Sequence, residues 1–138
     1  LAVAASGDDA VNRAVADEAR RSGVLVNVVD VPELSDFIVP SYVRRGDITL
    51  AISTAGRSPA LARKLRRRLE EQFGEEYGAL ARLVGEVRAE VRQEGTAIDG
   101  ETWQAALDID RLLDLIRSGE AEKARAALLD GLRTRPTG

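Results

Sequence analysis

The feature that most constrains the fold is a near-continuous run of aliphatic residues over 24–29, interrupted only by Asn27. Such a run is typical of a strand that is covered on both faces, as in parallel sheets. An apolar segment over 1–5 and an amphipathic segment over about 8–22 precede it, and Gly23 ends the second segment. Strand, helix and strand within 30 residues predict a βαβ unit.

The helix of this unit begins where the sequence offers a capping carboxylate. Asp8 or Asp9 is the expected N-cap. The apolar spacing predicts a buried face made of Val11, Ala14, Val15 and Ala19.

The pattern then changes to an alternating one. In the segment 47–54, Ile48, Leu50 and Ile52 fall on one side, which predicts a strand with one dry face and antiparallel pairing. The tripeptide Arg-Gly-Asp at 45–47 matches an adhesion motif, but we interpret it as a turn.

The remainder of the chain has helical spacing. Ser58 is expected to cap a helix that starts at Pro59 and runs to about Phe73. Three further helices, a linker over 95–100 and a polar tail from 133 follow, the helices covering about 75–93, 102–117 and 120–132. Their expected core positions are Leu80, Leu83, Val84, Val87, Val91, Trp103, Leu107, Ile116, Leu128 and Leu129.

Composition restricts the chemistry. The chain has no histidine and no cysteine, which excludes disulfides, thiolate metal sites and Ser-His-Asp triads. Proton transfer must therefore use a carboxylate, lysine, tyrosine or water, and we expect no metal site. The sequence shows no secretory signal and no membrane-spanning run, so we expect a cytoplasmic protein without a membrane partner.

Charge is concentrated in one stretch. Residues 44–68 hold eight basic groups against one acid, Asp47. The net charge is −3 and no aromatic residue accompanies the basic run, so we expect no nucleic-acid partner.

An ordered series of short motifs makes the sequence more specific. The motifs are Asn-Val-Val-Asp at 27–30, Pro32, Asp-Phe-Ile-Val-Pro at 36–40, Arg-Gly at 45–46, Ala-Ile-Ser-Thr-Ala-Gly-Arg-Ser-Pro at 51–59, Leu-Ala-Arg at 61–63 and Leu-Arg at 65–66. With these motifs in this order, the sequence resembles the precorrin-2 dehydrogenase / sirohydrochlorin ferrochelatase family, which includes the N-terminal module of siroheme synthase.

The resemblance implies an α/β fold in three parts. Residues 1–35 would be the C-terminal half of a Rossmann-like NAD-binding domain, 36–73 a dimerisation segment and 74–138 a small helical domain. The chain starts at Leu1 rather than methionine and has no G-x-G-x-x-G, so we expect the Gly-rich loop upstream of these residues.

The implied activity is NAD-dependent oxidation of precorrin-2 to sirohydrochlorin in siroheme biosynthesis, by a homodimer with a tetrapyrrole substrate. Some members also insert Fe²⁺, which would then be a second substrate. Two alternatives stay open. One is a nucleotide-binding dimerisation module without catalysis, and the other is a Rossmann dehydrogenase acting on small alcohols.

Asp30 is the expected catalytic residue. It follows a strand of parallel character, and ligands of open α/β sheets gather outside such strand ends. Dehydrogenation releases a proton, and the family's catalytic aspartate falls on this position. The alternative is an Asx-type turn before Pro32.

The remaining site residues follow from the resemblance and from local chemistry. Ala5 and Ser6 are assigned to cofactor binding. Substrate binding is assigned to Asn27, Ser53, Thr54, Gly56, Ser58 and Arg63. The alternatives are a structural amide for Asn27, a helix cap for Ser58 and a solvated face for the basic helix that contains Arg63.

Overall fold

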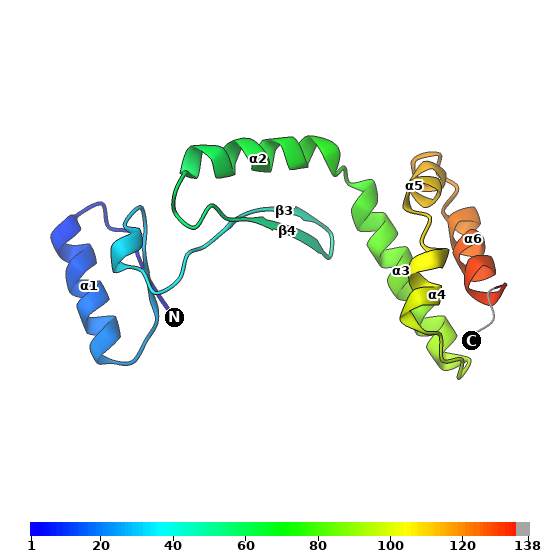
Figure 1. Cartoon of the computed structure of the whole chain (residues 1–138), viewed down its shortest axis with the longest axis horizontal. Coiled ribbons are helices and arrows are strands. Elements are labelled where there is room, and N and C mark those ends of the chain that lie inside the picture. The colour runs from blue at the N-terminus through cyan, green and yellow to red at the C-terminus, as the bar shows by residue number, and fades with distance from the viewer. Residues whose placement is uncertain (135–138) are drawn as a thin grey trace. The chain divides into compact units, whose positions relative to one another are not determined.

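The computed structural model describes residues 1–134 and divides the chain into two compact units. The first unit contains Leu1–Tyr42 and Ala51–Arg67, and the second contains Val43–Leu50 and the residues from Arg68 onward. Strands and helices mix as the α/β class requires, which confirms the expected fold class (Figure 1). The three-part division at residues 35 and 73 stays a prediction.

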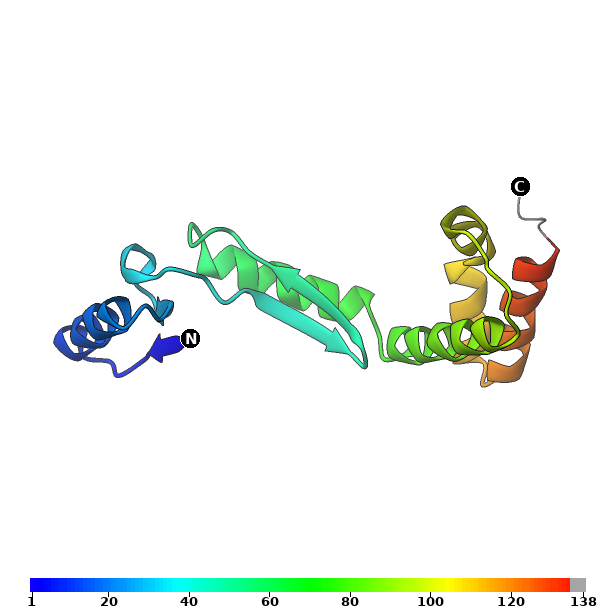
Figure 2. The ribbon, with the colours of Figure 1, turned by 90° about the horizontal axis from the view of Figure 1, so that it is seen from below.

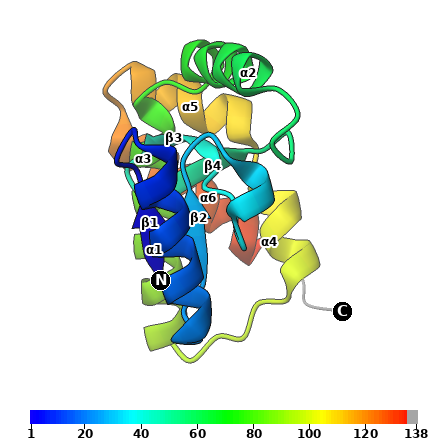
Figure 3. The ribbon, with the colours of Figure 1, turned by 90° about the vertical axis from the view of Figure 1, so that its left-hand side faces the viewer.

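A parallel pair of short strands forms the centre of the first unit. Strand β1 (Ala2–Ala4) pairs with β2 (Val26–Val28), with Ala2 opposite Val26 and Ala4 opposite Val28. Helix α1 (Asp9–Arg21) connects the two strands and lies alongside them (Figure 3). All three residues of β2 are buried, as expected for a strand covered on both faces. The βαβ prediction is confirmed.

Helix α1 begins as predicted but buries a different face. Asp8 is the N-cap, and its carboxylate accepts hydrogen bonds from the backbone N–H groups of Ala10 and Val11. The expected core face was wrong, because Val11 is 48% exposed and Val15 is 37% exposed. Ala14 is exposed as well, and of the predicted set only Ala19 is buried.

The buried face of α1 consists of Asn12, Ala16 and Ala19. Their spacing of four and three residues places them on one side of the helix. Ala16 and Ala19 belong to the same buried cluster as the strand residues Ala4, Val26 and Val28. The Asn12 side chain accepts hydrogen bonds from Ser6, so hydrophobicity alone did not predict this face.

A two-residue turn joins β3 (Ser41–Arg45) to β4 (Ile48–Ile52) in a hairpin, drawn with opposed arrows in Figure 2. The turn is Gly46-Asp47, with Gly46 at φ +56°, so the interpretation of the Arg-Gly-Asp tripeptide as a turn is confirmed. The alternation of β4 is confirmed too, while β3 itself was not predicted.

Helix α2 (Pro59–Gln72) begins and ends close to its predicted limits. The Ser58 hydroxyl accepts a hydrogen bond from the N–H of Leu61, which confirms the cap. At the other end, the Arg45 guanidinium donates to the carbonyl of Glu70 in the last turn at 3.2 Å and to that of Phe73, just beyond the helix, at 2.7 Å. These bonds tie the end of α2 to β3.

Four helices build the second unit around one core (Figure 1). They are α3 (Glu76–Gln93), α4 (Gly100–Ala106), α5 (Ile109–Arg117) and α6 (Ala121–Arg133). All of the predicted positions are either buried in this core or packed against it, but its most enclosed members include Leu112 and Leu113, which were not predicted. Residues 135–138 of the polar tail lie outside the described residues.

The single helix predicted over 102–117 is wrong. The chain breaks at Leu107, and the Asp108 carboxylate caps α5 by accepting from the N–H of Arg111. This break turns α5 so that Leu112 and Leu113 enter the core. No helix among residues 1–134 is long and apolar enough to cross a membrane.

An ion pair ties α3 to α5. The Arg117 guanidinium donates to the Glu76 carboxylate at 2.6 Å, and this hydrogen bond lowers the pKa of Glu76 below its ordinary value. Arg125 pairs with Glu90 and joins α6 to α3.

Two glycines of α3 provide a matched test of the packing. A Cβ atom at Gly78 would lie 3.0 Å from the carbonyl carbon of Arg45, whereas nothing lies within 4 Å of one at Gly85. We expect Gly78→Ala to destabilise the protein by about 1–3 kcal/mol through overpacking. Gly85→Ala should stabilise it by about 0.5–1 kcal/mol, because alanine favours the helix. Urea unfolding of both variants measures this difference, and equal effects would contradict the close contact.

Candidate functional site

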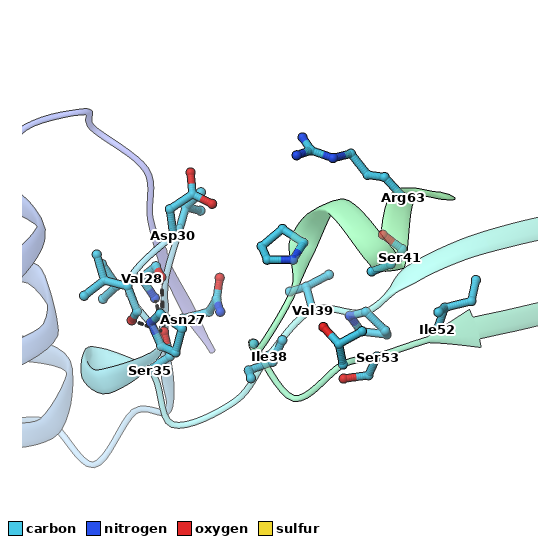
Figure 4. A pocket seen from close by; sticks show the side chains of 18 residues that line it. Asn27, Val28, Asp30, Ser35, Ile38, Val39, Ser41, Ile52, Ser53 and Arg63 are labelled. Carbon is cyan, nitrogen blue, oxygen red and sulfur yellow. Dashed lines mark hydrogen bonds between the residues drawn. The ribbon is translucent and has the colours of Figure 1, made fainter. Parts of the chain in front are cut away.

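A cavity of about 490 Å³ opens in the first unit, between the segment that follows β2 and the start of α2 (Figure 4). Apolar and proline side chains dominate its lining, with a few polar groups among them. Its lining residues are Asn27, Val28, Val29, Asp30, Val31, Pro32, Ser35, Ile38, Val39, Pro40, Ser41, Ile52, Ser53, Thr54, Gly56, Pro59, Ala62 and Arg63.

Asp30 occupies a turn directly after β2. The N–H of Val31 donates to the carbonyl of Val28 at 3.1 Å, which closes the turn around Asp30. Asp30 has φ +63°, a left-handed conformation that aspartate tolerates better than most residues. Its carboxylate is exposed at the cavity, on the β2 side in Figure 4.

Asn27 lies inside β2 and is 9% exposed. Its side-chain N–H donates to the carbonyl of Phe37 at 2.8 Å, so the amide holds the following segment against the strand. The backbone N–H of Asp36 donates to the carbonyl of Val26 at 2.7 Å in the same way. The structural alternative for Asn27 therefore has direct support, although the residue also lines the cavity.

The loop between β4 and α2 forms the other wall. Ser53 and Thr54 each accept a backbone hydrogen bond within the loop, from Ala55 and Ser58 respectively. A Cβ atom at Gly56 would lie 3.2 Å from the Pro32 ring, so this loop packs closely on the segment that follows Asp30. Ser53, Thr54 and Gly56 line the cavity, whereas Ser58 is outside the lining and caps α2.

Arg63 reaches the cavity from the first turns of α2, on the side away from Asp30 in Figure 4. Its side chain is exposed. Lys64, the next residue of the helix, is exposed but does not line the cavity. Arg63 is thus the position of the basic run that offers a cation to a molecule bound here.

Ala5 and Ser6 lie at the carboxyl end of β1, outside the cavity lining. The carbonyl of Ala4 accepts from the N–H of Val29, so the ends of β1 and β2 share one edge of the sheet. Both the N–H and the hydroxyl of Ser6 donate to the Asn12 side chain, at 3.0 and 2.8 Å.

These contacts limit how a dinucleotide fits. The Asp8 carboxylate already occupies the first N–H groups of α1, so the start of this helix does not suit a pyrophosphate. The exposed loop at Ala5 and Ser6 suits contact with the edge of a nucleotide bound at the strand ends. No group of three or more acidic side chains that could hold a metal ion occurs among residues 1–134.

Comparison with known proteins shows which proteins are similar to this chain. A family described as putative NAD(P)-binding matches residues 1–41, and the family described as sirohaem biosynthesis protein central matches 45–72. Siroheme synthase of Methylococcus capsulatus is 43% identical over 132 residues, which cover 94% of this chain. These matches support the resemblance to the siroheme synthase family.

A second relative and a solved structure show the same similarity. Siroheme synthase of Salmonella paratyphi B is 37% identical over 139 residues, which cover 99% of this chain. The chain spans only 28% and 30% of these two relatives. The solved structure of SirC, precorrin-2 dehydrogenase, superposes with a TM-score of 0.62 at 22% identity, covering 96% of this chain and 63% of that one, and so shares the fold.

Sequence reasoning missed the polar residue Ser35 of this site. Nothing in its local sequence distinguishes it from an ordinary loop serine. Its position depends on the short 3₁₀ helix Pro32–Leu34, which returns the chain to β2.

The close packing of Gly56 can be tested against a second glycine of the same unit. Gly56 has φ +77° and Gly23 has φ +67°, but no atom lies within 4 Å of a Cβ at Gly23. Alanine at either position costs about 1–2 kcal/mol for the left-handed backbone. Gly56→Ala should lower the melting temperature further than Gly23→Ala, since it also displaces Pro32. Thermal unfolding by circular dichroism measures both, and equal shifts would refute the packing.

Proposed function

We propose that the protein takes part in siroheme biosynthesis as an NAD-dependent precorrin-2 dehydrogenase, producing sirohydrochlorin. The observation that carries this proposal is the cavity of the first unit, which places the Asp30 carboxylate and the Arg63 cation around an apolar lining. The names of the relatives and of the structural neighbour support the same activity. A cytoplasmic location accords with it and stays a prediction.

Asp30 is the proposed general base. Oxidation of precorrin-2 removes a hydride and a proton, and a carboxylate at the cavity can accept the proton. With no histidine in the chain, Asp30 is the acidic residue among those that line the cavity.

A bound nicotinamide supplies the acceptor for the hydride. The match of residues 1–41 to a putative NAD(P)-binding family supports such a cofactor, and we propose NAD. Ala5 and Ser6 would contact the cofactor at the shared edge of β1 and β2, where the turn that contains Asp30 follows β2.

The carboxylates of the tetrapyrrole match the other groups of the site. Arg63 can pair with one carboxylate, and the hydroxyls of Ser53 and Thr54 lie at the same wall. Asn27 would act mainly by holding the segment that follows β2 against that strand. Gly56 would contribute by allowing close packing, and Ser58 by starting α2.

Insertion of Fe²⁺ into sirohydrochlorin is a second reaction that we assign to the same cavity, with the metal as substrate. Metal insertion releases the pyrrole N–H protons, and Asp30 could accept them as it accepts the proton of the oxidation. The alternative is a module that binds its ligands without catalysis. A protein that binds the tetrapyrrole but does not turn it over would support this alternative.

We also propose a homodimer that uses residues 36–73. Large apolar side chains of this segment are exposed in the first unit, including Tyr42 at 57% and Leu61 at 49%. Ile38, Val39 and Leu65 of the same segment are exposed as well, and a patch of such side chains would form a contact surface.

The base assignment predicts the behaviour of Asp30→Asn in the full-length protein. Asparagine also tolerates the left-handed backbone, so the fold should persist. Turnover of precorrin-2 should fall about 10²–10⁴-fold, the usual contribution of a general base. Absorbance of sirohydrochlorin follows the reaction, and circular dichroism checks the fold. Near wild-type turnover of Asp30→Asn would contradict the assignment of Asp30 as the base. If the unmodified protein binds the tetrapyrrole without turnover, the non-catalytic module is supported instead.

The charge assignment predicts different effects for two neighbouring residues. Arg63→Gln should raise the KM for precorrin-2 and weaken its dependence on salt, because it removes one screened attraction. Lys64→Gln, outside the cavity lining, is the matched control and should change neither. Steady-state kinetics at low and high ionic strength measures the KM of both variants. If the two variants behave identically, Arg63 is part of a solvated helix face and does not bind the substrate.

The assembly proposal predicts a dimer at micromolar concentration. Tyr42→Glu should shift it toward monomer, because a charge is costly in an apolar contact. Val11→Glu changes an apolar residue of α1 that is 48% exposed and lies outside 36–73, and it should leave the dimer intact. Light scattering reports the mass, and a monomeric unmodified protein would refute the proposal.

A further inference from the structure

Ser35 forms a cluster of hydrogen bonds with the turn that carries Asp30. Its hydroxyl oxygen accepts from the N–H of Val28 at 2.9 Å. The same hydroxyl lies 3.1 Å from the carbonyl oxygen of Val28 and 3.0 Å from that of Val31, and donates to this pair. Val28 and Val31 are the two ends of the turn, so one side chain holds both of them.

The turn needs such support because Asp30 adopts a left-handed backbone at φ +63°. A residue with a Cβ atom is strained in this conformation and keeps it only where the surroundings enforce it. The bond from the Val31 N–H to the Val28 carbonyl closes the turn, and Ser35 adds a second connection between the same residues.

Ser35 is itself held on both sides. The Arg20 guanidinium of α1 donates to the carbonyl of Leu34 at 2.8 Å and lies 3.8 Å from the Asp36 carboxylate. The other oxygen of that carboxylate accepts from the N–H of Val26 at 2.9 Å. The residues before and after Ser35 are therefore tied to α1 and to β2, which fixes the hydroxyl beneath the turn.

From this geometry we propose that Ser35 is a positioning residue for the dehydrogenase reaction. It acts through Asp30, by holding the turn 28–31 so that the carboxylate keeps one direction relative to the substrate. The proposal rests on the proposed function of Asp30. Ser35 would thus be a further residue of the site, and its hydroxyl bonds the backbone of the turn that carries Asp30.

The test compares Ser35→Ala with Asp30→Asn in the full-length protein. Misplacement of a catalytic group by about 1 Å costs up to roughly 10²-fold in rate, so kcat of Ser35→Ala should fall about 10–10²-fold. The KM for precorrin-2 should change little, because the other lining residues remain. Hydrogen exchange at the amides of Val28 and Val31 should accelerate. Ser22→Ala, which removes a hydroxyl bonded to Glu18 on α1, is the matched control and should change none of these values.

A double variant separates positioning from folding. In single-turnover measurements, Ser35→Ala should cause no further loss once Asp30→Asn is present, because its effect passes through the carboxylate. If Ser35→Ala fails to fold, Ser35→Cys keeps the size with a weaker hydrogen-bonding group and should show a smaller loss of kcat in the same pattern.

The outcomes distinguish the two proposals. An equal loss from the Ser35 change with and without Asp30 would overturn the positioning role, as would unchanged kcat or unchanged amide exchange. If Asp30→Asn abolishes turnover while both Ser35 variants keep it, only the role of Ser35 fails. If Asp30→Asn retains full turnover, the base assignment itself fails.

Discussion

Parallel pairing of β1 with β2 places the ends of both strands at one edge of the sheet, because parallel strands point the same way. Asp30 follows β2 there, and Ala5 and Ser6 follow β1. The helix between the strands buries small residues, which allows it to lie close to them. The position of the proposed base relative to the proposed cofactor contacts thus depends on this pairing and on the short connections that continue from it.

The local backbone converts this edge into a site. β2 ends in a turn with Asp30 in a left-handed conformation, and Ser35 bonds the two ends of that turn. The loop at Gly56 packs against Pro32 and closes the cavity from the side of α2. Two strained or crowded loops therefore meet where the chemistry is proposed, as is common for functional sites.

Periodic patterns in the sequence predicted the strands and helices that depend mainly on residues close together in the chain. The buried strand over 26–28, the alternation of β4 and the limits of α2, α3 and α6 follow from such patterns. The buried face of α1 did not, because it contains Ala16 and the hydrogen-bonded Asn12 in place of the more hydrophobic Val11 and Val15. The break before α5 required a cap at Asp108 inside an otherwise helical pattern. The position of Ser35 depends on a 3₁₀ turn that spacing does not reveal.

We propose that the cavity of the first unit binds the tetrapyrrole with Asp30 at the reacting edge. A crystal structure of the full-length protein with sirohydrochlorin would show where the macrocycle lies. We predict the macrocycle in this cavity, with the Asp30 carboxylate within hydrogen-bond distance of it and Arg63 paired with one of its carboxylates. A macrocycle bound elsewhere, or one held in the cavity with Asp30 turned away, would contradict the account.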